Sequence, residues 1–140
     1  MQTFLPHPNF RISASMLDRQ RLGKQRVEAQ QILNALAGKT KGWVNHPATK
    51  MWRGHEDALK RYLKCCIDEW VSRGYKNNMG VQAPTHAILP PWVGDERVHS
   101  SHRANLLRKD PEHYRQFWPK LRDDLPYVWP IGKERGRTSR

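Results

Sequence analysis

The stretch from Leu17 to Leu36, LDRQRLGKQRVEAQQILNAL, decides the fold of this chain. An α-helix turns by about 100° per residue, which gathers apolar side chains of this stretch into one arc. That arc consists of Leu22, Ala29, Ile32, Leu33 and Leu36. The stretch therefore predicts a long helix that packs this arc against the core and ends at Gly38.

A polar arc lies beside the apolar one on the same helix. It consists of Arg21, Lys24, Gln25, Glu28 and Gln31. Glu28 stands where the two arcs meet, so a carboxylate lies at the edge of the core among cationic and amide groups. Such a position favours a proton donor or a charge stabiliser. The alternative is that Arg21 and Glu28 hold neighbouring loops by hydrogen bonds.

Further helices follow from local start and stop signals. Pro47, with Asn45 or His46 as its cap, starts a helix that the apolar spacing carries to Gly74. Asp95 caps another helix through about Lys109, and Asp110-Pro111 starts one more that ends before Pro119. No alternating strand pattern of useful length is present. The prediction is a compact, single-domain all-α protein in which the long early helix packs on a second long helix.

Charge indicates the kind of partner. The chain of 140 residues carries 25 Lys and Arg against 13 Asp and Glu, a formal net charge of +12. Such an excess points to a polyanion, most often nucleic acid. No stretch is apolar enough to span or anchor in a membrane, so we expect no membrane partner. Residues 132–140, GKERGRTSR after Ile131, predict a flexible basic tail behind a domain of residues 1–131.

Cysteines and histidines limit the metal chemistry. Cys65 and Cys66 are adjacent in a helical pattern and cannot pair without breaking it, so we expect reduced thiols and a cytoplasmic protein. No C-x-x-C pair supports structural zinc. His99 and His102, with His46, form only a weak pattern for a metal site. We therefore expect no metal.

The segment SHRANLLRKD, residues 101–110, is unusually polar for a helix that merely packs. Its candidate contacts with phosphates or bases are His102, Arg103, Asn105, Arg108 and Lys109. A solvated helix face is the alternative interpretation.

Six pieces of the chain carry a resemblance to known proteins. They are MQTFLPHPNF (1–10), LDRQRLGKQRVEAQQIL (17–33), NHPATKMWRGHE (45–56), PPWVGD (90–95), SHRANLLRKDPEHY (101–114) and DDLPYVWP (123–130). They resemble a family of small bacterial and phage proteins named for pyrimidine-dimer DNA glycosylase, the endonuclease V type. The pieces span nearly the whole chain and match best a poorly characterised branch of that family.

The resemblance implies an all-α enzyme that needs no metal or cofactor and flips a base out of double-stranded DNA. In such an enzyme the N-terminal amine attacks the sugar C1′, and a helical Glu lies beside that amine. The Glu corresponds to Glu28, and a nearby Arg to Arg26 or Arg21. The family exposes a small residue after Met removal, whereas Gln2 here is bulky and we expect Met1 to be retained. The nucleophile is then the Met1 amine, Lys24 or water, and lyase activity is left open.

We therefore predict a monomeric DNA N-glycosylase with Glu28 as its catalytic carboxylate and Asp18 as the second choice. The residues expected to contact DNA or orient the site are Arg21, Gln25, Arg26, His46, His102, Arg103, Asn105, Arg108 and Lys109. Two other classes of protein compete with this prediction. One is a basic DNA-binding protein without catalysis, and the other is a metal-dependent nuclease built on the histidines.

Overall fold

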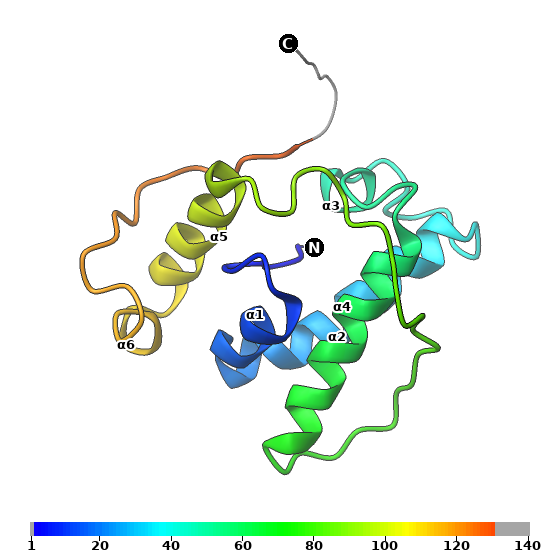
Figure 1. Ribbon diagram of the computed structural model, residues 1–140, viewed down its shortest axis with the longest axis horizontal. Coiled ribbons are helices and arrows are strands. Elements are labelled where there is room, and N and C mark those ends of the chain that lie inside the picture. Colours follow the sequence, from blue (N-terminus) through cyan, green and yellow to red (C-terminus); the bar gives the residue numbers. More distant parts are fainter. Residues whose placement is uncertain (1, 131–140) are drawn as a thin grey trace.

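A computed structural model describes residues 2–130, and the helices it contains form one compact body (Figure 1). The helices are α1 (Phe10–Met16), α2 (Arg19–Leu36), α3 (Pro47–Lys50), α4 (Glu56–Ser72), α5 (Glu96–Lys109) and α6 (Pro111–Tyr114). Residues 2–130 contain no strand, which confirms the all-α prediction. None of these helices is both long and apolar enough to cross a membrane. The predicted tail of residues 132–140 lies outside the described residues.

Local signals fix most helix ends. Asp18 caps α2 by accepting a hydrogen bond from the Arg21 amide, and Asp95 caps α5 through the Arg97 amide. The prediction of one helix from Pro47 to Gly74 is wrong. Gly54 takes a positive φ of 82° between α3 and α4, a conformation that a helix cannot contain. α6 is also shorter than predicted, because it ends at Tyr114 rather than just before Pro119.

The core lies mainly between α2 and α4, which pack on each other as predicted. Leu22, Ala29 and Ile32 of the predicted apolar arc are fully buried, Leu33 is nearly so, and Leu36 packs at the margin. They meet the apolar side of α4, represented by Leu59 and Leu63. Burying one such Leu or Ile side chain contributes roughly 1.5–3 kcal/mol, so this interface supplies much of the stability of the fold.

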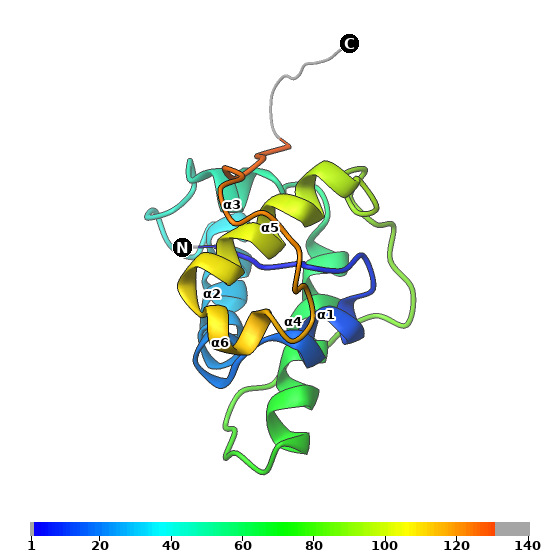
Figure 2. The same cartoon turned by 90° about the vertical axis from the view of Figure 1, so that its left-hand side faces the viewer.

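Residues 2–6 form an extended arm through the middle of the molecule. In Figures 1 and 2 this N-terminal arm runs between α5 on one side and the α2–α4 pair on the other. Phe4 and Leu5 are buried there. Trp52 and Tyr62 lie beneath it, and the Trp52 indole donates to the Thr3 hydroxyl at 3.0 Å. The arm is therefore part of the core rather than a loose extension.

Candidate active site

Glu28 lies on α2 where the N-terminal arm passes. Its Oε1 accepts a hydrogen bond from the backbone N–H of Gln2 at 3.3 Å and another from Nε2 of Gln25 at 3.4 Å. Both of these bonds use Oε1, which leaves Oε2 without a hydrogen-bond partner among residues 2–130. The carboxylate is partly exposed. It is thus anchored through one oxygen while the other can face a substrate.

Gln25 joins the arm to both long helices. Its side-chain oxygen accepts from the Phe4 amide at 2.9 Å and from the Tyr62 hydroxyl at 2.6 Å. Its side-chain nitrogen donates to the Gln2 carbonyl at 2.7 Å as well as to Glu28. Of the two roles expected for Gln25, contact with DNA or orientation of the site, its burial at 1% exposure favours the second. Gln25 fixes the arm beside the carboxylate.

Two histidines of α5 hold the other side of the arm. Nδ1 of His102 accepts from the Leu5 amide at 3.0 Å, and Nδ1 of His99 donates to the Leu5 carbonyl at 2.7 Å. Nε2 of His99 accepts from the Gly94 amide at 2.9 Å. Each ring therefore accepts one backbone N–H, which requires both to be neutral. Burial lowers the pKa of His102 to about 3 and also lowers the pKa of His99.

A cavity of about 190 Å³ opens next to Glu28. Its lining residues are Gln2, Phe4, Arg21, Lys24, Gln25, Glu28, Lys109 and Tyr127. The lining combines cationic side chains from α2 and α5 with the rings of Phe4 and Tyr127, which lie 6.3 Å apart. The cationic side chains are suited to bind a phosphate, and the aromatic rings are suited to stack on a nucleobase.

A second, more open groove of about 540 Å³ runs along the outer side of α2. Lys24 and Glu28 line this groove as well as the cavity, so they stand on the ridge between the two. Its floor includes Gly23, where a Cβ atom would lie 3.1 Å from ring carbons of Trp70. The glycine thus lets the Trp70 ring lie directly on α2.

The two arginines proposed from the resemblance lie in different places. Arg21 lines the Glu28 cavity and forms an ion pair with Asp18 at 3.3 Å. Arg26 stacks its guanidinium 4.3 Å from the centre of the Trp70 ring, and it does not line that cavity. Arg21 is therefore the arginine that this geometry places with Glu28.

Asp18, the second choice for a catalytic carboxylate, is tied into structural contacts. It caps α2, pairs with Arg21 and accepts a hydrogen bond from the Tyr114 hydroxyl. Burial opposes ionisation, but the bond from Tyr114 and the charge of Arg21 outweigh it and lower the pKa of Asp18. Asp18 does not line the Glu28 cavity.

His46 caps α3, since its Nδ1 accepts from the Ala48 amide at 3.0 Å. Partial burial lowers its pKa, while the negative charge of Glu28 acts in the opposite direction. The His46 ring also contacts that of Trp129, with the ring centres 6.2 Å apart.

The predicted DNA contacts of α5 divide into three groups. His102 is fully buried and Asn105 is 6% exposed, so neither meets a DNA surface in this conformation. Arg103 donates to the Pro6 carbonyl and Arg108 to the Leu125 carbonyl, which gives both a role in holding chain segments. Lys109 is exposed and lines the Glu28 cavity.

Aromatic and arm residues of the site were missed from sequence. Phe4 and Tyr127 are far from Glu28 along the chain, and only the path of the arm and of residues 122–130 brings them together. Trp70, which lines the outer groove, was not a candidate either. Within residues 2–130 no three His, Cys, Asp or Glu side chains are grouped in a way that could hold a metal ion.

These features define a basic helical protein with a carboxylate, a lysine and aromatic rings around one small cavity. A family model described as pyrimidine dimer DNA glycosylase matches residues 1–83, and the chain belongs to this family. The matched region contains the arm and α1 to α4, hence Glu28 and Lys24 but not Lys109 or Tyr127. Comparisons with curated proteins and with solved structures gave no match. Family membership supports DNA glycosylase activity and DNA as the substrate.

Proposed function

We propose that this protein excises a damaged or modified base from double-stranded DNA, with Glu28 as the catalytic carboxylate. The observation that carries the proposal is the hydrogen bond of 3.3 Å between the Gln2 amide and Glu28 Oε1, at a cavity that Lys24 also lines. This hydrogen bond places Gln2 beside the Glu28 carboxylate, and the Lys24 side chain lines the same cavity. The resemblance assigned the same role to Glu28.

Cleavage of the glycosidic bond develops positive charge at C1′ and on the ring oxygen of the sugar as the base leaves with the bonding electrons. A carboxylate beside that carbon stabilises the charge electrostatically. The second oxygen of Glu28, without a partner among residues 2–130, is the atom we assign to this task. Arg21 and Lys109 in the same cavity are suited to hold the flanking phosphates.

The nucleophile is the Met1 amine, the Lys24 amine or water. Attack by an amine forms a C1′–N bond and expels the base, and opening of the sugar ring then gives an imine. Attack by water leaves an abasic sugar and no covalent adduct. Lys24 lines the Glu28 cavity, which supports its candidacy, while Met1 lies outside the described residues.

The family description favours a pyrimidine dimer as the lesion. Its two bases are covalently joined, so cleavage of one glycosidic bond detaches a base from its sugar but leaves it attached to the other base, and base release from a dimer means this cleavage. The test is a duplex oligonucleotide with a single thymine dimer, incubated with the protein in EDTA. We expect abasic sites or strand breaks at the dimer under these conditions. Binding of this duplex without base release would exclude the dimer as substrate, and the absence of base release from every damaged or modified DNA would make the protein a non-catalytic binder. Activity that stops in EDTA would indicate a metal-dependent nuclease.

Borohydride then separates the nucleophiles. It reduces an imine and so traps the protein on DNA if an amine attacks. Loss of trapping in Lys24→Ala assigns the lysine, and loss after selective blocking of the N-terminal amine assigns Met1. Base release without any trapped adduct assigns water.

A further inference from the structure

Trp43 has an unusual backbone conformation. Its φ is 69°, and it is the one residue other than glycine with a positive φ among residues 2–130. A bulky L-residue is strained in this left-handed region. Such strain persists only where surrounding structure imposes it, and it is concentrated at functional positions.

The surrounding turn imposes this conformation. The His46 amide donates to the Trp43 carbonyl at 3.0 Å, which closes the turn just before α3. Arg53 donates to the Val44 carbonyl at 2.7 Å and so ties the turn to the segment after α3. The conformation of Trp43 is therefore fixed by its neighbours before any partner binds.

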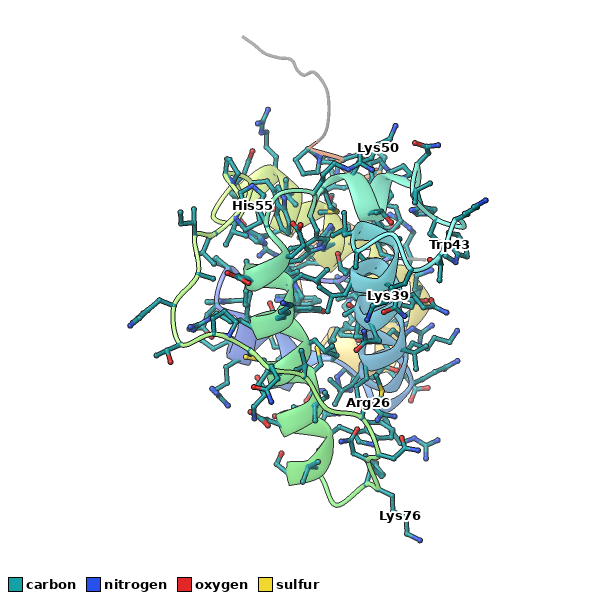
Figure 3. The ribbon with its side chains drawn as sticks, turned by 90° about the vertical axis from the view of Figure 1, so that its right-hand side faces the viewer. Arg26, Lys39, Trp43, Lys50, His55 and Lys76 are labelled. Carbon is teal, nitrogen blue, oxygen red and sulfur yellow. The ribbon has the colours of Figure 1, made fainter. Side chains whose placement is uncertain are left out.

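The strain does not serve to bury the side chain. Trp43 is 48% exposed, whereas Trp52 and Trp92 are in the core. Its ring contacts His46 edge-on, with the ring centres 5.3 Å apart. Figure 3 shows Trp43 at the margin of the molecule, with Lys39 and Lys50 on either side of it in that view. The turn thus presents a large aromatic ring to solvent on a basic part of the surface.

A row of ring contacts connects Trp43 to the candidate active site. His46 lies between Trp43 and Trp129, and the Trp129 ring centre is 5.5 Å from that of Tyr127. Tyr127 in turn lines the Glu28 cavity. A duplex bound over the cavity would therefore extend past Trp43.

We propose that Trp43 is a wedge that inserts into the base stack of duplex DNA next to the nucleotide held at Glu28. This inference rests on the proposed function, because it assumes that the protein opens a duplex. Removing a base from a duplex requires it to leave the stack, and the space that opens is filled by an apolar or aromatic side chain in many DNA-bending proteins. Every base has a π-face, so an indole ring can stack on a neighbouring base whatever the DNA sequence.

The test uses Trp43→Gly, because glycine removes the ring and also relieves the positive φ. A ring that packs for stability would lower the melting temperature when removed, whereas we expect this variant to melt no lower than the wild type. Base–aromatic stacking is worth roughly 1–3 kcal/mol, so single-turnover base release from a duplex should fall by about 5- to 150-fold. Phe117→Ala, which removes an exposed ring next to α6, is the matched control and should change neither quantity.

The direct readout is 2-aminopurine placed opposite a thymine dimer in the duplex, because its fluorescence rises when it unstacks. We expect the rise on binding of wild type and of Phe117→Ala, and its loss with Trp43→Gly. Mismatches around the dimer should restore much of the base release of Trp43→Gly, since they open the stack in advance.

The outcomes for the wedge and for the glycosylase are distinct. Equal fluorescence and base release for wild type and Trp43→Gly would overturn the wedge and leave the glycosylase proposal intact. If the wild type causes no rise in fluorescence, the wedge is overturned whatever the rate of base release. A Trp43→Gly variant that melts at a lower temperature but releases the base at the wild-type rate would also overturn the wedge. A Trp43-dependent rise without any base release supports the wedge and overturns the glycosylase proposal.

Discussion

The backbone N–H of Leu5 donates to Nδ1 of His102 at 3.0 Å, although 97 residues separate the two in sequence. His99 binds the carbonyl of the same Leu5, so one arm residue is held at both of its backbone polar groups by α5. On the opposite side Gln25 holds Gln2 and Phe4. The arm that touches Glu28 is therefore positioned from two sides by buried side chains.

This arrangement predicts that stability decreases with acidity. The folded protein keeps His102 neutral, with a pKa of about 3, and also lowers the pKa of His99. Unfolded histidines titrate near 6.5, so the unfolded chain binds more protons below that pH. The stabilisation is complete above about pH 6.5 and is lost as the pH falls toward the folded pKa. Between pH 7 and 4.5, His102 alone should account for about 2–3 kcal/mol of the free energy of unfolding.

Urea unfolding at several pH values measures this effect. His86→Gln is the control, because His86 is exposed and its loss should leave the pH dependence unchanged. His102→Gln should reduce the slope of stability against pH. A free energy of unfolding that stays constant from pH 7 to 4.5 would contradict the neutral histidine pair.

Gln25→Ala should destabilise the protein and detach the arm. It leaves the Phe4 amide and the Gln2 carbonyl without their side-chain partner in a buried place. Each such group costs roughly 1–3 kcal/mol, so the free energy of unfolding should fall by about 2–4 kcal/mol. Tyr62→Phe removes a hydroxyl that contacts both Gln25 and the Phe4 carbonyl, but it leaves the bonds from Gln25 to Phe4 and Gln2 in place, so it should cost less, about 1–2 kcal/mol. Equal losses for the two variants in urea unfolding would mean that Gln25 is not the main anchor.

Gly23 should tolerate alanine but not a larger residue. Alanine favours a helix over glycine by about 1 kcal/mol, but its Cβ would lie 3.1 Å from the Trp70 ring and force a small shift. We expect these effects to offset each other, with a melting temperature near that of the wild type. Gly23→Val must displace the ring and should cost about 1–3 kcal/mol. A melting temperature of Gly23→Val equal to that of the wild type would show that Trp70 does not rest on α2.

Lys109 should contribute to DNA affinity through a phosphate. Each phosphate contact adds about −0.9 to the slope of log affinity against log salt concentration. Lys109→Ala should therefore make that slope shallower by about that amount for duplex DNA. Lys64→Ala is the matched control, because Lys64 pairs with Asp68 on α4 and does not line the cavity. An unchanged slope for Lys109→Ala in fluorescence anisotropy titrations would remove Lys109 from the DNA interface.

Helices with clear end signals could be predicted from sequence. Gly38 follows the end of α2, and Asp95 and Asp110 bound α5, because caps and left-handed glycines act within a single turn. The Asp18 cap of α2 was not predicted. The break between α3 and α4 was missed. Apolar spacing continues across it, and the positive φ of Gly54 depends on the turn that the Trp52 carbonyl closes with the His55 amide.

The candidate site could be predicted only in part. The helical period placed Glu28 at the edge of the core, where the structure has it partly exposed. The same period left Gln25 among polar residues, although the arm covers it completely. His102 and Asn105 were likewise assigned to the surface because a polar residue on a helix usually faces solvent. Which polar groups turn inward depends on where a distant segment needs hydrogen bonds, and a local pattern does not contain that information.

The most direct test of the account is the rate of base release by Glu28→Gln from a thymine-dimer duplex. The amide keeps the shape of the side chain and can still accept from Gln2, so DNA affinity and melting temperature should stay close to those of the wild type. The rate should fall by about 10²–10³-fold, the usual cost of losing one positioned electrostatic group at a reacting centre. Glu112→Gln on α6 is the control and should keep the wild-type rate. Base release by folded Glu28→Gln at the wild-type rate would contradict the proposed mechanism.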